Sequence, residues 1–312
     1  MSAVTVAVDG GQSGIRMRVG GHGDVRTEGL GHLEGDVADG LLRRIRAGLA
    51  ELGTTPPIGR MVLGLTVVPG DEEGRIELAR ELATGLGIPR VDVVGDELTA
   101  HAGAFGGGPG VVLTVGTGIA CLGFAPATGA SRRVDGDGFL LGDAGSAFWL
   151  GSRGVEAVLR ARDGRGAPTA LEAACDERYG AHPDLAAWLH ARPRAVAEIA
   201  AFAHDVQLTA EVGDPVAAAL VASAADELIA TARAAAAPLG ERPCALAPSG
   251  RAVSPGSALR TALEARVAAD DALVLVEAQG DPLDGAWAIA EGRVPAAYAE
   301  QLSSWILNRR TS

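Results

Sequence analysis

The chain has 312 residues, which is long enough for two domains of ordinary size. Asp and Glu number 39 against 27 Lys and Arg, and this net charge of −12 excludes a general attraction to nucleic acid or to anionic lipid. A hydrophobic content of 47% excludes a disordered chain. We therefore expect a globular protein with small-molecule ligands, and neither nucleic acid nor membrane as a partner.

The chain contains no lysine, so all 27 basic residues are arginine. Without lysine there is no Walker A phosphate loop, no protein-kinase strand lysine and no Schiff base with pyridoxal phosphate. A nucleotide would have to be held by backbone amides, hydroxyl groups, arginine and a metal ion.

The cysteines and the apolar segments indicate a cytoplasmic protein. Cys121, Cys175 and Cys244 lack zinc-ligand spacing, and the first residues lack the pattern of a signal peptide. The long apolar segment 217–237 contains Asp226, Glu227 and Arg233, which favours a soluble helix over a membrane span.

Strands and helices alternate in the first half, which predicts an α/β fold. We expect strands at 4–8, 15–19, 61–68 and 91–94, and helices at 39–52, 76–86 and 97–105. A glycine turn joins the first two strands. The same strand, glycine turn and strand recur at 111–115 and 119–125, after a glycine-rich tract typical of a domain boundary.

The second half repeats this pattern with more helix. We expect strands at 244–247 and 273–276, and helices at 147–162, 186–204, 214–237, 256–268, 281–291 and 295–308. The expected domains are residues 1–107 and 108–294, with a C-terminal helix at 295–312 completing the first domain.

The first glycine turn can hold phosphate. After the strand end at Asp9, glycines let the backbone present several N–H groups, and a serine adds a hydroxyl donor, in the run Gly10, Gly11, Gln12 and Ser13. Asp9 could hold a hydrated Mg²⁺ beside these phosphates. The alternative is an ordinary glycine-rich hairpin.

The second turn, Gly116, Thr117 and Gly118, offers the same amides and a hydroxyl. A Gly-Thr-Gly sequence alone is explained by hairpin preference. Two matching turns, each opening an α/β half, favour instead a pair of loops that hold one polyphosphate from both sides.

Two aspartates and one histidine are candidates for chemistry on a substrate. Asp96 follows a buried strand and is placed to accept a proton from a hydroxyl, or else to cap a helix together with Thr99. Asp143 lies between glycines and could bind a sugar hydroxyl or metal-bound water, or share helix capping with Ser146. His32 lies in a glycine-rich loop where a substrate could rest, although a plain loop explains it as well.

These motifs resemble those of the N-acetylglucosamine kinase and BadF-type ATPase family of the actin-like sugar kinase superfamily. The likeness extends over nearly the whole chain. It is carried by Ala7-Val8-Asp9-Gly10-Gly11-Gln12-Ser13-Gly14, Val115-Gly116-Thr117-Gly118, Leu141-Gly142-Asp143-Ala144-Gly145-Ser146, Asp163-Gly164-Arg165-Gly166, Gly213-Asp214 and Pro282-Leu283-Asp284-Gly285.

The resemblance implies two ribonuclease-H-like domains with an interdomain cleft that binds ATP and Mg²⁺. It implies phosphoryl transfer to the 6-hydroxyl of an amino sugar, such as N-acetylglucosamine or glucosamine, by a cytoplasmic homodimer. Asp96 takes the position of the general base, His32 and Asp143 that of sugar contacts, and Asp9 that of the metal contact. Gly213 and Gly250 fall on the adenosine side, beside the two phosphate turns.

The sequence departs from this family where Ile119 and Ala120 follow the Gly-Thr-Gly turn in place of Ser-Asn. An acceptor that relies on those polar side chains would bind less well. We therefore expect N-acetylglucosamine to be a weaker substrate than the resemblance suggests, with an unacetylated or differently substituted sugar preferred. Two other functions remain open at this point. One is an ATP-hydrolysing activator of a partner reductase, and the other is a sugar sensor without catalysis.

Overall fold

The computed structural model describes residues 3–11, 14–29, 36–53 and 57–307. The chain forms two compact units. Unit 1 comprises residues 1–109, 124–130 and 278–312, and unit 2 comprises residues 110–123 and 131–277. Gln12, Ser13 and His32, three of the candidate site residues, lie outside the described residues.

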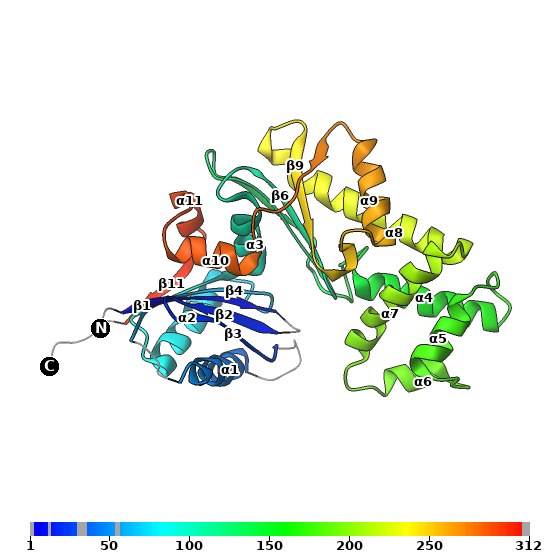
Figure 1. Cartoon of the computed structure of the whole chain (residues 1–312), viewed down its shortest axis with the longest axis horizontal. Helices are drawn as coiled ribbons and strands as arrows, with labels where there is room; N and C mark the ends of the chain where they lie inside the picture. Colours follow the sequence, from blue (N-terminus) through cyan, green and yellow to red (C-terminus); the bar gives the residue numbers. More distant parts are fainter. Residues whose placement is uncertain (1–2, 12–13, 30–35, 54–56, 308–312) are drawn as a thin grey trace. The chain divides into compact units, whose positions relative to one another are not determined.

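The described part of unit 1 contains a mixed six-stranded sheet in the order β11-β5-β4-β1-β2-β3 (Figure 1). Strands β1, β4 and β5 are parallel, whereas β2, β3 and β11 are each antiparallel to a neighbour. The strands are β1 (Val4–Gly10), β2 (Ile15–Val19), β3 (Gly23–Thr27), β4 (Ile58–Leu65), β5 (Arg90–Gly95) and β11 (Ser303–Ile306).

Side chains alternate across β1, so each face of this sheet has its own core. Val6 and Val8 belong to a large apolar cluster that includes residues of α1 and α2, whereas Ala7 packs against α10. The helices of unit 1 are α1 (Val37–Glu51), α2 (Glu72–Leu86), α3 (Asp96–Phe105), α10 (Pro282–Ala290) and α11 (Ala296–Ala299).

Helices α3 and α10 meet at a contact that requires glycine. A Cβ atom added to Gly285 would lie 1.9 Å from the carbonyl oxygen of Thr99. A Cβ atom added to Gly103 would lie 2.1 Å from the carbonyl oxygen of Asp281. The two helix backbones therefore touch directly, which fixes the position of α3 within unit 1.

The described part of unit 2 contains a five-stranded sheet in the order β10-β9-β6-β7-β8, in which β9 runs parallel to both β6 and β10. The strands of this sheet are β6 (Gly110–Val115), β7 (Ile119–Ala125), β8 (Ala130–Val134), β9 (Cys244–Ser249) and β10 (Leu273–Leu275). The last two residues of β7 and the first residue of β8 are counted with unit 1. The helices of unit 2 are α4 (Ala147–Arg162), α5 (Leu171–Tyr179), α6 (Leu185–His190), α7 (Ala195–Glu211), α8 (Pro215–Ala236) and α9 (Ala258–Ala268).

Among the described residues, one helical segment, Pro215–Leu239, is long and apolar enough to cross a membrane by length and composition. Its buried side chains include Val221, Ala225 and Leu228, and α8 packs against α4, α7 and α9. A core helix of a globular domain passes the same test.

The α/β prediction is confirmed, but the expected C-terminal helix at 295–312 is wrong. The described part of that region, residues 295–307, contains only the four-residue helix α11 and then β11, which pairs with β5. Pairing with an open sheet edge gives the backbone N–H and C=O groups of β11 hydrogen-bond partners. The hydroxyl of Ser304 also donates to the buried carboxylate of Asp92 at 2.6 Å. Residues 278–294, expected in the second domain, belong to unit 1.

The helix expected at 186–204 is also wrong as a single element. It is divided into α6 and α7, and Pro193 lies between them. Proline lacks the N–H group that a continuous helix needs at this point. Strands β3 and β8 and helix α5 were not expected, because their patterns are short and largely polar.

We predict that Gly285→Ala destabilises the protein by about 1–3 kcal/mol, because the new methyl group overlaps the backbone of α3. Alanine normally stabilises a helix relative to glycine, so a loss of stability would come from this contact. Denaturant unfolding measures the effect. Gly70→Ala, where a Cβ atom meets nothing within 4 Å, is the matched control and should be nearly neutral. Equal stability of both variants would contradict the close helix packing.

Candidate functional site

The register of the parallel strands in unit 1 brings three segments to one edge of the sheet. Gly10 of β1 is paired with Leu65 of β4, and Leu65 is paired with Gly95 of β5. The residues that follow these strand ends are therefore neighbours along the edge. They are the first glycine turn, Thr66 and Asp96.

The first glycine turn is closed by its own backbone. The amide of Gly11 donates to the carbonyl oxygen of Gly14 at 3.0 Å, and the carbonyl oxygen of Gly10 accepts from the amide of Thr66 at 3.0 Å. The Gly11 amide is thus engaged within the turn, so a phosphate group would have to be bound by other donors there.

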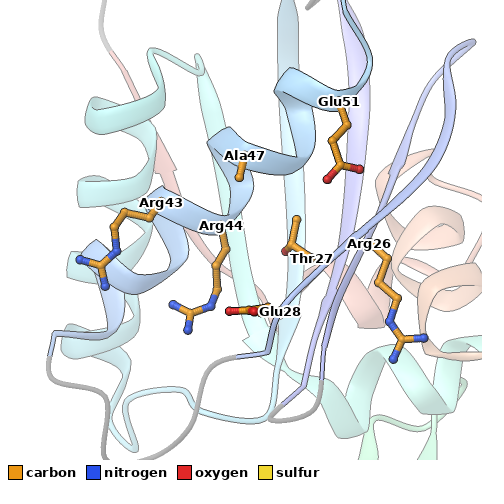
Figure 2. A pocket seen from close by; sticks show the side chains of 7 residues that line it. All are labelled: Arg26, Thr27, Glu28, Arg43, Arg44, Ala47 and Glu51. Atoms are coloured by element: carbon orange, nitrogen blue, oxygen red, sulfur yellow. The ribbon is translucent and has the colours of Figure 1, made fainter.

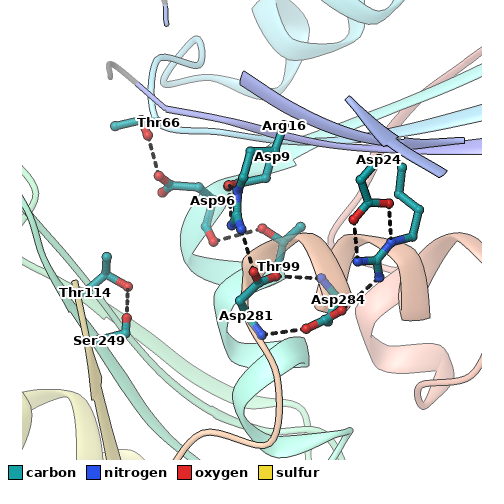
Figure 3. Close-up of polar contacts among 11 residues, drawn as sticks. Asp9, Arg16, Asp24, Thr66, Asp96, Thr99, Thr114, Ser249, Asp281 and Asp284 are labelled. Atoms are coloured by element: carbon teal, nitrogen blue, oxygen red, sulfur yellow. Dashed lines mark hydrogen bonds and ion pairs between the residues drawn. The ribbon is translucent and has the colours of Figure 1, made fainter. Parts of the chain in front are cut away.

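Asp9 is part of an ion-pair network within unit 1 (Figure 3). Arg16 donates to Asp9 Oδ2 from Nε and Nη2, at 2.9 and 2.8 Å, and also pairs with Asp281. Arg18 pairs with Asp24 and with Asp284. Burial raises the pKa of Asp9, and the contact with Arg16 opposes this effect. The network joins β1 and β2 to the start of α10.

The carboxylate of Asp9 fits a magnesium site in which the ion is held through water. The described residues contain no group of three or more His, Cys, Asp or Glu side chains that could hold a metal ion. Arg16 occupies Oδ2 of Asp9, which leaves Oδ1 for water bound to an ion. Magnesium is commonly held in this way, by one or two carboxylates together with waters and substrate phosphates.

Asp96 begins helix α3, but its side chain does not cap that helix. The N-cap residue is Gly95, and the Asp96 carboxylate accepts a hydrogen bond from the Thr66 hydroxyl. Thr99 donates from its hydroxyl to the Asp96 backbone carbonyl oxygen at 3.0 Å (Figure 3). The expected pairing of Asp96 and Thr99 in a helix cap is therefore wrong.

The second glycine turn, in unit 2, is anchored to the start of α4. The amide of Gly116 donates to the Gly118 carbonyl oxygen at 2.9 Å. The carbonyl oxygens of Gly116 and Thr117 accept from the amides of Ala147 and Phe148, at 3.0 and 3.1 Å. These bonds fix the turn that joins β6 to β7.

Asp143 lies against this second turn. Its side chain is 6% exposed, and a Cβ atom added to Gly118 would lie 2.4 Å from Asp143 Oδ2. Among the described residues, Oδ1 has no hydrogen-bond partner. Burial raises the pKa of Asp143, the neighbouring carboxylates Asp135 and Asp137 add to this, and the nearby amides of Ile119 and Gly138 oppose it. A hydroxyl group or a metal-bound water could satisfy the orphaned oxygen.

The alternative in which Asp143 shares helix capping is wrong. Ser146 alone caps α4, accepting from the amide of Trp149 at 3.1 Å. Asp143 has a φ of 61°, in the left-handed region that side chains other than Asn and Asp rarely adopt. Its amide donates to Asp135 Oδ1 at 2.6 Å, which holds it in this conformation.

The two glycines expected on the adenosine side are both in unit 2, but only one is shown to lie at the second turn. A Cβ atom added to Gly250 would lie 2.3 Å from the carbonyl oxygen of Val115, directly before the turn. Thr114 and Ser249 also share a hydrogen bond of 3.0 Å across β6 and β9 (Figure 3). Gly213 follows α7 with a φ of 94°.

A cavity of about 750 Å³ lies elsewhere in unit 1, between β3 and α1 (Figure 2). None of the predicted site residues lines it. Its walls are Arg26, Thr27, Glu28, Arg43, Arg44, Ala47 and Glu51. The guanidinium group of Arg26 points away from Glu28 and Arg44. It lies instead by the first glycine turn, where a Cβ atom added to Gly14 would be 3.1 Å from Arg26 Nε.

Sequence reasoning missed Thr66 and Arg26. Thr66 directly follows an apolar strand, which is a signal of a strand end, but the register was needed to place it beside Asp96. Arg26 gave no signal, because it lies in the short polar strand β3.

The model of the BadF/BadG/BcrA/BcrD ATPase family matches residues 15–290. The chain belongs to this family. The matched range includes Asp96, the second glycine turn, Asp143 and the whole of α10.

Three relatives illustrate the range of similarity. An N-acetylmuramic acid/N-acetylglucosamine kinase of Clostridium acetobutylicum is 31% identical over 141 residues, which cover 45% of this chain and 46% of that protein. The match thus spans about half the length of this curated relative. The structure of a suggested N-acetylglucosamine kinase from Chromobacterium violaceum is 28% identical, with a TM-score of 0.72 over 91% of this chain and 97% of that one.

A more distant structure supports the fold alone. The ROK family glucokinase of Streptomyces griseus, determined with glucose and AMPPNP, is 17% identical, with a TM-score of 0.56 over 93% of this chain and 100% of that one. The family member described here thus shares the α/β fold of these structures, as expected.

We predict that Asp143→Asn raises the free energy of unfolding at pH 7, because the neutral amide avoids the cost of burying a charge. Because the folded-state pKa of Asp143 is raised, this residue favours folding at low pH, and that contribution is lost as pH rises through the folded pKa. The gain on substitution should therefore shrink below pH 4. Denaturant unfolding across this pH range measures it, with the exposed Asp271→Asn as control. A variant less stable than wild type at pH 7 would contradict an orphaned carboxylate.

Proposed function

We propose that this family member is an ATP-dependent kinase that transfers a phosphoryl group to the 6-hydroxyl of an amino sugar. The observation that carries the proposal is the row of strand ends in unit 1. Thr66 binds the Gly10 carbonyl through its amide and the Asp96 carboxylate through its hydroxyl. A glycine turn suited to phosphate and a carboxylate suited to proton removal thereby form one hydrogen-bonded group.

The two glycine turns, from Gly10 to Ser13 and from Gly116 to Gly118, are the proposed phosphate-binding segments. They would bind phosphate through hydroxyls and through amides other than those of Gly11 and Gly116, which are engaged within the turns. Arg26 lies by the first turn and has no ion pair or hydrogen bond among the described residues, so its charge is available to phosphate oxygens. Gly213 and Gly250 belong to the adenosine side.

Asp96 acts as the general base. A carboxylate within reach of the acceptor hydroxyl removes its proton as the oxygen attacks phosphorus, and ADP leaves with the displaced bond electrons. Asp9 would hold Mg²⁺ through water, and the ion would neutralise charge on the phosphates. Phosphoryl transfer requires mainly positioning and charge neutralisation, so a chain without lysine is competent for it.

The sugar is an amino sugar bound through Asp143 and His32. The Clostridium acetobutylicum relative is named for two such acceptors, N-acetylmuramic acid and N-acetylglucosamine. Ile119, which follows the second turn, is 6% exposed and cannot donate a hydrogen bond to an acetamido group from its side chain. We therefore propose that N-acetylglucosamine is not the preferred substrate. We also propose a homodimer located in the cytoplasm.

The reductase activator is not favoured. An iron–sulfur cluster needs accessible thiolate ligands. Cys121, Cys175 and Cys244 are all buried, and burial raises the pKa of Cys121 to about 12 and that of Cys175 to about 11. Thiols of this kind stay protonated at neutral pH and are poor ligands.

A panel of acceptors tests the proposed function. Glucosamine, N-acetylglucosamine, N-acetylmuramic acid, N-acetylmannosamine and glucose are each incubated with ATP and Mg²⁺, and ADP release is followed. We expect one amino sugar to raise ADP release well above the rate without sugar, with N-acetylglucosamine below the best acceptor. Sugar binding without turnover would indicate a sensor, and no sugar dependence across the panel would contradict the kinase.

We predict that Asp96→Asn lowers kcat by about 10²-fold or more, while ATP binding stays near the wild-type value. Asparagine keeps the shape and can accept the bond from Thr66 through its side-chain oxygen, but it cannot take a proton. Steady-state turnover and ATP titration measure the two effects. Asp71→Asn, which changes the capping residue of α2, is the control and should leave kcat unchanged. A fully active Asp96→Asn enzyme would exclude Asp96 as the base.

A further inference from the structure

Thr66 occupies a position between two candidate parts of the site. Its amide donates to the Gly10 carbonyl oxygen at 3.0 Å, at the end of β1. Its hydroxyl donates to Asp96 Oδ2, at the start of α3. The same hydroxyl oxygen is 4.0 Å from the place where a Cβ atom on Gly11 would lie. One half-buried residue therefore touches both the first glycine turn and the carboxylate.

The Thr66 hydroxyl constrains the orientation of the Asp96 carboxylate. A hydroxyl has a single proton, and Thr66 donates it to Oδ2 of that carboxylate. The carboxylate is also held against rotation about its side-chain bonds, because its partner is fixed to the backbone of the sheet edge.

The backbone of Asp96 is held independently of its side chain. The hydroxyl of the fully buried Thr99 donates to the Asp96 carbonyl oxygen at 3.0 Å. A Cβ atom added to Gly64 of β4 would lie 2.2 Å from that Thr99 hydroxyl oxygen, so β4 and α3 are in close contact here. Loss of the Thr66 hydroxyl would therefore remove one contact that orients the carboxylate and leave the start of α3 in place.

We propose that Thr66 is a positioning residue that orients the Asp96 carboxylate and links it to the turn that binds nucleotide phosphate. The proposal rests on the proposed function, since it assigns Thr66 a role in the same reaction. Thr66 removes no proton itself. Its contribution is to hold the base in reach of the acceptor hydroxyl, where a small displacement is costly to the rate.

A purely structural role for Thr66 makes a different prediction. If the hydroxyl only satisfies a polar group at the sheet edge, its removal lowers the free energy of unfolding and leaves kcat of the folded enzyme unchanged. A positioning role lowers kcat with little change in KM for ATP, because the amide bond to Gly10 remains after substitution.

The test uses Thr66→Val and Thr66→Ser, each alone and combined with Asp96→Asn. Valine keeps the shape and removes the hydroxyl, whereas serine keeps the hydroxyl. We expect Thr66→Val to lower kcat about 10-fold with KM for ATP within about two-fold, and Thr66→Ser to restore most of the rate. In the Asp96→Asn background, Thr66→Val should cause no further loss, because two residues that act together are not additive.

Thr128→Val is the matched control, since this threonine hydroxyl donates only within a turn, to the Ala125 carbonyl oxygen at 3.3 Å. Its kcat should equal that of wild type. If Thr66→Val fails to fold, Thr66→Ala replaces it in the same cycle, and the comparison with Thr66→Ser is unchanged.

The outcomes separate the two proposals. A wild-type enzyme without sugar-dependent turnover overturns the proposed function, and the role of Thr66 with it. An active wild type with full kcat in Thr66→Val overturns only the positioning role. An equal further loss in the Asp96→Asn background also overturns it, because Thr66 would then act independently of Asp96.

Discussion

The parallel register of β1, β4 and β5 is the constraint on which the candidate site depends. Gly10, Leu65 and Gly95 lie abreast, so the chain leaves three neighbouring strands at the same edge of the sheet. A shift of one residue in either pair would turn every side chain of that strand to the other face. The core forbids this, because Val8, Leu63 and Val93 are all buried in one apolar cluster. Packing inside unit 1 therefore fixes where the glycine turn and Asp96 meet.

Helix α10, on the other face of this sheet, supports the position of Asp96. Helix α10 packs on Ala7 and, through Gly285, on the backbone of α3, whose first residue is Asp96. Two ion pairs link β2 to the start of α10, namely Arg16 with Asp281 and Arg18 with Asp284. Exposed ion pairs contribute little to stability individually. Their importance lies in joining Asp9, through Arg16, to the helix that supports α3.

Much of this fold could be predicted from the sequence, because apolar runs followed by glycine indicate strand ends. The two glycine turns and Asp96 were found in that way. Thr66 was not, since a threonine after a strand has no special meaning until the register places it beside Asp96. The strand β11 was missed because Ser303–Ile306 is short and follows residues with helical character, and only the open edge of β5 decides its structure. Tertiary pairing commonly overrides local preference in such segments.

Asp143 marks the limit of sequence reasoning in unit 2. Its place between glycines suggested a ligand contact or a helix cap, and the sequence could not decide between them. A ligand contact is favoured by the close approach of Gly118 to the Asp143 carboxylate and by the orphaned Oδ1. Both are properties of the folded chain. A buried carboxylate with one unpaired oxygen and a raised pKa opposes folding at neutral pH. Such a cost is typical of a binding site, where strain is tolerated for function.

The most direct test of phosphoryl transfer to a primary hydroxyl is proton-coupled phosphorus NMR of the reaction with the best amino sugar. Phosphate on the 6-oxygen is attached to a CH₂ group, so the product signal should be a triplet, whereas phosphate on the anomeric oxygen gives a doublet. The account predicts the triplet, growing at the rate at which ATP is consumed. Signals of ADP and inorganic phosphate alone, without a sugar phosphate signal, would contradict it.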